Sequence, residues 1–142
     1  MNEWDKIWKR RSMDIEITDD VFDMFCKLKC ADGFDTQNVE GYYEAFYQEW
    51  NEMYKKMIKF TKNISSVYEV GCGSGVNLYL FQQQKNIERL GGCDYSDTLI
   101  NMAHKVLHIK DLKCQEADKI LTEPKYDVVL ADSVFQYFQD TE

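Results

Sequence analysis

Three glycines spaced by single residues form the pattern in this chain that most directly suggests chemistry. Gly71, Gly73 and Gly75 follow a half-apolar run that ends at Val70, and a second apolar stretch begins at Val76. Glycine lets a backbone leave a strand sharply and approach a ligand closely, because no Cβ stands in the way. Amides at the start of the following helix would face the ligand, with the positive end of the helix dipole behind them. The pattern therefore predicts a cofactor-binding turn.

The spacing differs from that of a dinucleotide-binding turn. The G-x-G-x-x-G pattern requires glycine where this chain has Val76, so the turn lacks the residue that reads a diphosphate. An acid, Glu69, also stands two residues before Gly71. Gly75 is expected to let the helix pack tightly on the preceding strand. The missing glycine and the added acid weigh against a nicotinamide dinucleotide.

A second acid follows the next apolar run. Asp94 lies 19 residues beyond Gly75, directly after a predicted strand. In a right-handed βαβ unit this position brings its carboxylate beside the glycine turn, where it can accept hydrogen bonds from both ribose hydroxyls of an adenosine. Tyr95, next to it, could stack on the adenine ring or could equally be an ordinary surface residue. Asp94 supports an adenosine cofactor without choosing which one.

The elements that must position these residues change character near residue 63. Beyond it, strands alternate with helices, which is typical of a parallel sheet in an α/β fold. The fourth strand is apolar enough to be buried on both faces. A further helix is expected over 134–138. Strands are predicted near 64–70, 89–93, 112–116 and 126–132, and helices near 76–85 and from a Ser96 cap to 107.

Residues 1–62 carry helical patterns and no strand signal. Thr18 is expected to cap a helix that ends near Gly33. The clearest periodic stretch follows, and its apolar stripe predicts packing on the domain. That stripe consists of Val39, Tyr43, Phe46, Trp50, Met53 and Met57. A short amphipathic helix is predicted around Trp4, Ile7 and Trp8.

The glycine turn and the residues after it resemble a known family. The stretch from Glu69 to Gly75 is similar to the first motif of class I S-adenosylmethionine-dependent methyltransferases, which is an acid, one residue and then G-x-G-x-G. Further matches follow in family order over roughly residues 65 to 138. They are Asp94, Glu116 and Ala117 with Ile120, and the stretch from Asp127 to Asp132.

This resemblance implies a cofactor, S-adenosylmethionine, and a set of residues that bind it. The acid after the third strand would face the adenine amino group, and Glu116 is favoured over the competing Asp118 because it fits the family register. Asp132 and Ser133 would border the methionine part of the cofactor. The implied cofactor-binding residues are Glu69, Gly71, Cys72, Gly73, Gly75, Asp94, Tyr95, Glu116, Ala117, Asp132 and Ser133.

The resemblance also sets expectations for the architecture. The family has a Rossmann-like parallel sheet of seven strands in the order 3-2-1-4-5-7-6, and this sequence supplies only the first four. We therefore expect a fragment or short form of a longer enzyme, with residues 1–62 as a helical lid segment and residues 63–142 as the N-terminal half of the methyltransferase domain. Some of Tyr42, Tyr43, Tyr47 and Trp50 would close over the cofactor. The exposed edge of strand four could pair with another copy or a partner.

Composition narrows the class of partner. A length of 142 residues with 44% hydrophobic residues suits one folded domain. The formal charge of −8 would repel phosphate backbones, so no nucleic acid is expected, and no apolar run approaches membrane-spanning length. Five cysteines without a signal sequence predict reduced thiols and a cytoplasmic protein. Cys26 with Cys30, and His104 with His108, have the i, i+4 spacing of a shared metal site. No third and fourth ligand stands nearby in the sequence, so no metal is expected.

The sequence thus predicts methyl transfer from S-adenosylmethionine to an acceptor that is more in keeping with a small molecule than a macromolecule. No catalytic residue is assigned, because Gln136 stands where many small-molecule methyltransferases have a histidine, and glutamine cannot take a proton. Two alternatives remain. One is a non-catalytic module that keeps the cofactor fold for interaction or regulation, and the other is a nicotinamide-dependent oxidoreductase.

Overall fold

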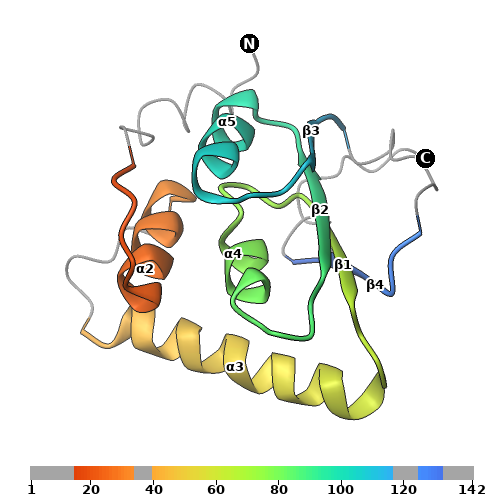
Figure 1. Ribbon diagram of the computed structural model, residues 1–142. Helices are drawn as coiled ribbons and strands as arrows, with labels where there is room; N and C mark the ends of the chain where they lie inside the picture. Colours follow the sequence, from red (N-terminus) through yellow and green to blue (C-terminus); the bar gives the residue numbers. More distant parts are fainter. Residues whose placement is uncertain (1–14, 34–39, 117–124, 133–142) are drawn as a thin grey trace, which may run out of the picture.

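A computed structural model describes residues 15–33, 40–116 and 125–132 of the chain. Strands and helices alternate after residue 63 as the sequence predicts, with ends that differ by a few residues (Figure 1). The elements in chain order are α2 (Val21–Ala31), α3 (Tyr42–Phe60), β1 (Ser66–Val70), α4 (Val76–Gln82), β2 (Arg89–Asp94), α5 (Asp97–Val106), β3 (Asp111–Cys114) and β4 (Val128–Ala131).

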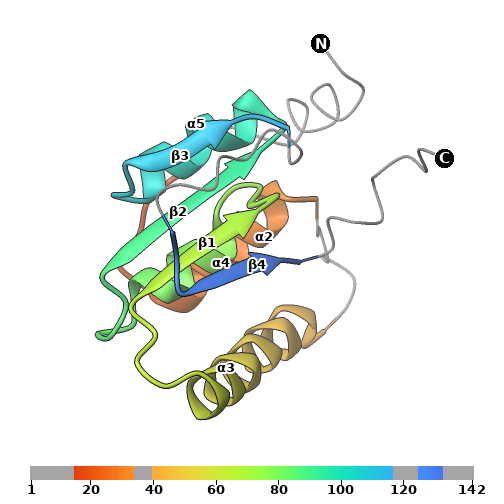
Figure 2. The same cartoon turned by 90° about the vertical axis from the view of Figure 1, so that its right-hand side faces the viewer.

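The sheet is parallel and has the order β3-β2-β1-β4, which confirms the predicted Rossmann-like arrangement. Val70 lies opposite both Cys93 and Ala131, and Asp94 lies opposite Cys114. All four strands therefore end at the same edge of the sheet, close to the C-terminal end of α2 (Figure 2). In open α/β sheets this edge is where ligands bind.

The helices gather on one face of the sheet and enclose the main hydrophobic core (Figures 1 and 2). Val67 of β1 and Leu78 of α4 are fully buried there, together with Phe25 and Leu28 of α2. A smaller cluster on the other face contains Tyr68, Val70, Cys93, Tyr126 and Ala131. The core thus joins residues on both sides of position 63.

Strand β4 corrects one expectation. The sequence predicts that its residues are buried on both faces, but Val129 is 65% exposed. Within the described residues β4 pairs only with β1 and forms the edge of the sheet. An apolar sequence shows that a strand can be buried, whereas the layer that covers each face is decided by the rest of the fold.

The N-cap of helix α2 lies two residues beyond its predicted position. Asp20, not Thr18, is the N-cap, because its side chain accepts a hydrogen bond from the amide of Asp23. The Thr18 hydroxyl instead lies 3.1 Å from a carboxylate oxygen of Asp23. The helix ends at Asp32, and Gly33 follows with a positive φ, as a glycine stop requires.

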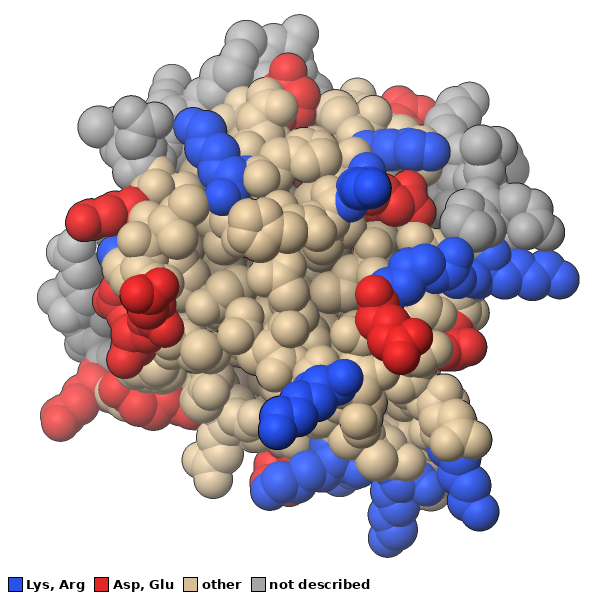
Figure 3. Space-filling view, in the orientation of Figure 1, with Lys and Arg blue, Asp and Glu red and all other residues tan. Residues whose placement is uncertain are grey.

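The aromatic stripe of α3 packs inward as predicted, with Trp50 the most deeply buried. Its ring stacks on Tyr54 and makes an edge contact with Phe81, with the two ring centroids 5.0 Å apart. Lysines gather toward the lower right of Figure 3, over the C-terminal part of α3, and acids gather on the side of α2. Helix α3 lies at the end of the helical layer away from the glycine turn (Figure 1).

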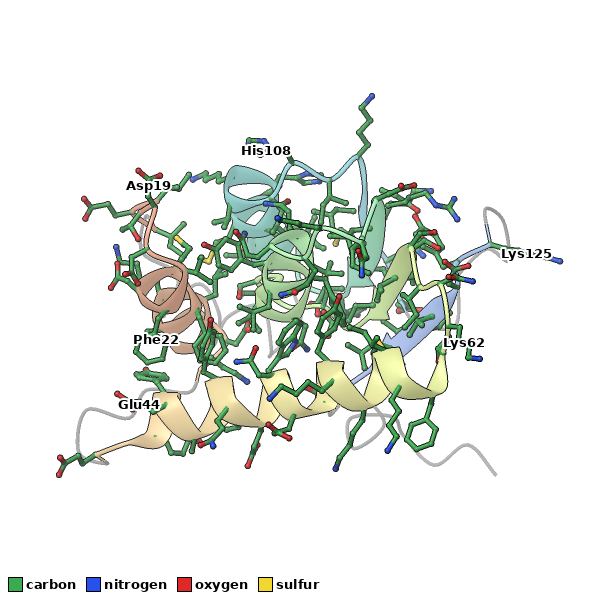
Figure 4. The ribbon with its side chains drawn as sticks, turned by 60° about the horizontal axis from the view of Figure 1, so that its bottom comes forward. Asp19, Phe22, Glu44, Lys62, His108 and Lys125 are labelled. Carbon is green, nitrogen blue, oxygen red and sulfur yellow. The ribbon has the colours of Figure 1, made fainter. Side chains whose placement is uncertain are left out.

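The predicted lid aromatics have core partners in this arrangement. Tyr47 makes edge contacts with Phe22 and Phe25, and Figure 4 shows Phe22 between α2 and α3. The indole nitrogen of Trp50 is buried without a hydrogen-bond partner. The lid role of these residues stays a prediction.

Asp127 connects the beginning of β4 to the beginning of β1 through hydrogen bonds. Its Oδ2 accepts hydrogen bonds from the amides of Ser65 and Ser66 at 2.8 and 3.1 Å, and from the Ser65 hydroxyl at 3.0 Å. These bonds favour the ionised carboxylate and lower its pKa. Asp127 therefore belongs to the scaffold, at the opposite end of the strand from the glycine turn.

Phe81→Ala is expected to destabilise the fold by about 3–5 kcal/mol, because a fully buried ring would leave a cavity against Trp50 and Tyr54. Chemical denaturation measures the change. Phe60→Ala is the matched control, since Phe60 is 81% exposed and its loss should change stability by less than about 0.5 kcal/mol. Equal losses from the two variants would contradict the packing described here.

Several predictions from the sequence fall on residues that the structure does not describe. They include the helices around Trp4 and beyond Val134, and the site candidates Ala117 and Ser133. In the described part of the chain, no helix combines the length and apolarity needed to cross a membrane.

Candidate functional site

The glycine turn connects β1 to α4 at the carboxyl edge of the sheet. Gly71, Gly73 and Gly75 all have positive φ, a backbone conformation that L side chains rarely adopt. The amide of Cys72 donates to the carbonyl oxygen of Cys93 at 2.9 Å, which binds the turn to the end of β2. The Cys72 side chain itself is buried in the main core. The start of the turn is thus bound to the sheet, whereas the amides of Gly73 and Ser74 donate to nearby carboxylates.

Asp94 is the last residue of β2 and lies beside the turn, as the sequence predicts. Its Oδ2 accepts a hydrogen bond from the amide of Gly73 at 2.8 Å, and its Oδ1 accepts one from the amide of Ser96 at 2.9 Å. Ser96 in turn caps α5 by accepting from Leu99. Asp94 therefore joins the turn, β2 and the start of α5, and each of its oxygens keeps a lone pair for a ligand hydroxyl.

Two further candidates lie near the same edge. Tyr95 is 50% exposed, so its ring is accessible beside Asp94. Glu116 is exposed two residues beyond Cys114, which pairs with Asp94 in the sheet. The structure brings both to the carboxyl edge, where a ligand that lies across β1 and β2 would reach them.

Gly73 has a different neighbour from the one expected. A Cβ on Gly73 would lie 2.6 Å from Oδ1 of Asp32, so the space that glycine leaves is filled by a side chain from α2. The carboxylate of Asp32 accepts from the Ser74 amide at 2.8 Å and lies 3.0 Å from the Ser74 hydroxyl. Asp32 therefore occupies the space beside Gly73 that the sequence leads us to expect for a ligand.

Gly75 also serves a contact other than the predicted one. A Cβ there would lie 2.6 Å from Cδ1 of Leu107 and 3.3 Å from the Cβ of Ala103. The glycine therefore allows the turn to pack against the end of α5, rather than α4 against β1. The spacing of the glycines predicts that Gly75 makes a close contact, but the partner in that contact depends on how α5 packs.

Glu69 is a carboxylate buried directly beneath the turn. It is 2% exposed, and its Oε2 accepts a hydrogen bond from the side-chain amide of Asn77 at 2.6 Å. The same amide lies 3.4 Å from Oδ2 of Asp132, so one asparagine joins the ends of β1 and β4. Oε1 of Glu69 is buried without a hydrogen-bond partner in the structure. A buried acceptor of this kind is ready for a donor from a ligand.

Four acids therefore converge on the turn, and three of them are costly to ionise. Burial raises the pKa of Glu69 well above its usual range, and the nearby charges of Asp132, Asp32 and Asp94 add to this. Burial raises the pKa of Asp32 to about 7 despite its bonds from Ser74. The pKa of Asp94 is also raised by burial, although its bonds from Ser96 and Gly73 oppose the shift. A cation bound here would favour the ionised carboxylates and lower their pKa values.

Asp32→Asn tests this electrostatic picture through stability. The folded chain keeps a proton on Asp32 up to about pH 7, whereas the pKa of an unfolded aspartate is 3.8. Folding therefore favours the protonated form, and the native chain loses stability as the pH rises from about 4 to about 7. Asparagine has no proton to lose.

The expected result is that the variant gains stability relative to the native chain across this interval, and that the gain levels off above pH 7. Urea denaturation at a series of pH values measures the difference, and Glu69 and Asp94 titrate in both proteins. A difference that stays constant from pH 4 to pH 8 would show that Asp32 has an ordinary pKa.

Sequence reasoning missed two residues at this site. Asp32 stands just before Gly33, where the sequence predicts only the end of a helix, and nothing local connects it to a turn 42 residues further along the chain. Asn77 lies in the first turn of α4, eight residues beyond Glu69. A polar residue at the second position of a helix that follows a glycine turn was the signal in the sequence that could have identified Asn77. Ala117 and Ser133 lie outside the described residues.

Comparison with known proteins identifies the domain. A family model described as a methyltransferase domain matches residues 68–142. The chain belongs to the methyltransferase family. The parallel sheet and the glycine turn are those of its Rossmann-like, class I S-adenosylmethionine-dependent branch, as the motif from Glu69 to Gly75 predicts.

Two relatives of this methyltransferase domain are malonyl-[acyl-carrier protein] O-methyltransferases. The protein from Haemophilus influenzae is 29% identical over 80 residues, which cover 56% of this chain and 31% of the relative. The protein from Bacillus cytotoxicus is 22% identical over 81 residues, covering 54% and 27%. The chain thus spans less than a third of the length of these relatives.

Solved structures agree with the fold. The plantazolicin methyltransferase BpumL, in complex with a monoazolic desmethylPZN analog and S-adenosylhomocysteine, is 28% identical with a TM-score of 0.54 over 75% of this chain and 41% of BpumL. Magnesium protoporphyrin IX methyltransferase from Synechocystis, with bound S-adenosylmethionine, has the same TM-score over 88% of this chain and 67% of its own, at 16% identity. The second likeness concerns the fold alone.

Proposed function

We propose that this methyltransferase domain binds S-adenosylmethionine at the glycine turn and transfers its methyl group to a small-molecule acceptor. The convergence of Asp32, Glu69, Asp94 and Asp132 on the turn carries the proposal. These carboxylates favour a ligand that bears a sulfonium and an ammonium group. The same charges would repel the diphosphate of a nicotinamide dinucleotide, which is the alternative cofactor of this fold.

Each candidate residue has a part that suits this cofactor. The carboxylate of Asp94 accepts hydrogen bonds from the ribose hydroxyls, and Tyr95 and Glu116 are the candidates for the adenine ring and its amino group. The unpartnered Oε1 of Glu69 supplies an acceptor for the ammonium group, with Asp132 beside it. Gly71, Cys72, Gly73 and Gly75 contribute backbone, and Ala117 and Ser133 stay predictions.

S-Adenosylmethionine brings a methyl group that is already activated by a sulfur leaving group. What the domain must add is alignment in a site that excludes water, and orientation of this kind contributes up to about 7–11 kcal/mol in well-aligned reactions. A base is needed only if the acceptor must lose a proton first. No described residue is assigned that role.

The acceptor remains at the level of chemical class. The two relatives are named as O-methyltransferases of malonyl-[acyl-carrier protein], and the structural neighbour BpumL is a plantazolicin methyltransferase. We extend to this chain only the coarser feature, a small reactive group rather than a nucleic acid, in keeping with its charge of −8.

Calorimetric titration of the chain with S-adenosylmethionine, S-adenosylhomocysteine and NADH tests the cofactor. We expect the first two to bind and NADH to show no heat of binding. The reverse result would favour an oxidoreductase. Transfer of labelled methyl to a panel of small acids, amines and thiols tests the reaction, and cofactor binding without any transfer would favour the interaction or regulatory module.

The remaining proposals concern context. Residues 1–62 are proposed as a helical lid segment before the domain of residues 63–142. The edge of β4, where Val129 is exposed, is proposed as a surface for self-association or a partner, which light scattering would detect as a dimer. The five cysteines all lie in the described residues and form no disulfide there, in keeping with a reducing, cytoplasmic location.

A further inference from the structure

We propose that Asp32, at the C-terminal end of α2, is a positioning residue of the cofactor turn. It acts by holding the Ser74 peptide, and with it the backbone of the turn, in the conformation that the ligand requires. The inference rests on the proposed role of the turn in cofactor binding. It makes the end of α2 part of the site, although the whole of α3 lies between α2 and the first strand of the sheet in the sequence.

Asp32 and Ser74 form a two-point contact. Oδ1 of Asp32 accepts from the Ser74 amide at 2.8 Å, and Oδ2 lies 3.0 Å from the Ser74 hydroxyl. That hydroxyl is also 3.1 Å from the carbonyl oxygen of Leu28, one turn back in α2. Ser74 is completely buried, so water cannot replace these partners. The contact fixes both the position and the rotation of the Ser74 peptide.

Together with Asp94, this contact clamps two consecutive amides from opposite sides. Asp94 comes from β2 and accepts from Gly73, whereas Asp32 comes from α2 and accepts from Ser74. The absence of a Cβ on Gly73 is what allows Asp32 to approach, because a Cβ would lie 2.6 Å from its Oδ1. Asp94 alone would leave the peptide of Ser74 without an acceptor.

The contact is not needed to attach α2 to the domain. Met24, Phe25 and Leu28 already anchor the helix in the main core and are at most 1% exposed. The charged and titratable groups that face Asp32 are Lys29 of its own helix, Glu69, Cys72 and Asp94. The contribution of Asp32 is therefore local to the turn.

Titration of S-adenosylhomocysteine into three variants at pH 8 tests the proposal. Asp32→Ala removes both hydrogen bonds and is expected to weaken binding about tenfold. Asp32→Asn keeps them, because its oxygen accepts from the Ser74 amide and its NH₂ donates to the hydroxyl, so binding should stay within about threefold of native. Asp19→Ala, at an exposed acid before α2, is the control and should bind as the native chain does.

The outcomes separate this proposal from the one it rests on. If the native chain does not bind the ligand, the proposed function fails, and Asp32 loses its role with it. If the native chain binds and Asp32→Ala binds equally well, or if Asp32→Asn is as weak as Asp32→Ala, only the positioning role is overturned.

A second measurement does not depend on the folding of a variant. The NMR signal of the Ser74 amide in the native chain should move as Asp32 ionises near pH 7, and again when S-adenosylhomocysteine is added. A signal that responds to only one of these changes would show that Asp32 and the ligand do not act on the same peptide.

Discussion

Gly73→Val is expected to reduce the affinity for S-adenosylhomocysteine on the order of 100-fold, about 2.7 kcal/mol. The residue has a φ of +58°, and a left-handed conformation strains a β-branched side chain by about 1–3 kcal/mol. Its Cβ would also lie 2.6 Å from Oδ1 of Asp32. The turn must move to relieve both, and the hydrogen bond from the Gly73 amide to Asp94 is disturbed with it. Calorimetric titration measures the loss.

Gly41→Val is a matched control for this variant. Gly41 has a φ of +76° and begins α3, yet a Cβ there would meet nothing within 4 Å. The same valine at a comparable φ should therefore lower stability without changing affinity. Equal affinities for Gly73→Val and the native chain would contradict the assignment of the turn as the cofactor site.

Asp94→Ala is the second variant with a large expected effect, again a loss of roughly 100-fold in affinity. It removes the acceptor that holds the Gly73 and Ser96 amides, and also the proposed acceptor for the ribose. Hydrogen bonds to a charged group contribute about 1.5–3 kcal/mol each, so the loss of two or more accounts for this magnitude.

An analogue that lacks the ribose 2′-hydroxyl separates these two contributions. The native chain should bind it more weakly than the parent ligand, whereas Asp94→Ala should no longer distinguish the two. Asp97→Ala is the control, because Asp97 is exposed in the first turn of α5 and only three residues away. If Asp94→Ala still preferred the hydroxylated ligand, Asp94 would not be the ribose acceptor.

Much of this fold follows from local patterns. The alternation of apolar strands with helices after residue 63 predicts a parallel sheet, and its strand order is the one that the resemblance to the methyltransferase family implies. The fixed handedness of βαβ units then predicts that Asp94, the acid after the second strand, lies beside the glycine turn, where it accepts from Gly73. The Ser96 cap is equally local and is also confirmed. These features depend on residues close in sequence or on general chirality.

The rest depended on which distant residues meet. Asp32 reaches Ser74 only because α2 packs beside α4, and no periodicity in α2 encodes that neighbour. The same holds for the contact of Gly75 with Leu107 and for the exposure of Val129 at the edge of the sheet.

The parallel sheet, the glycine turn and the acid beside it can therefore be predicted from local patterns, since short-range sterics and handedness act on each segment alone. The contact of a second carboxylate from α2 with the turn, and the link that Asn77 makes between Glu69 and Asp132, emerge only when the chain is packed. Those contacts are set by how whole helices fill the space above the sheet, which is a property of the complete core.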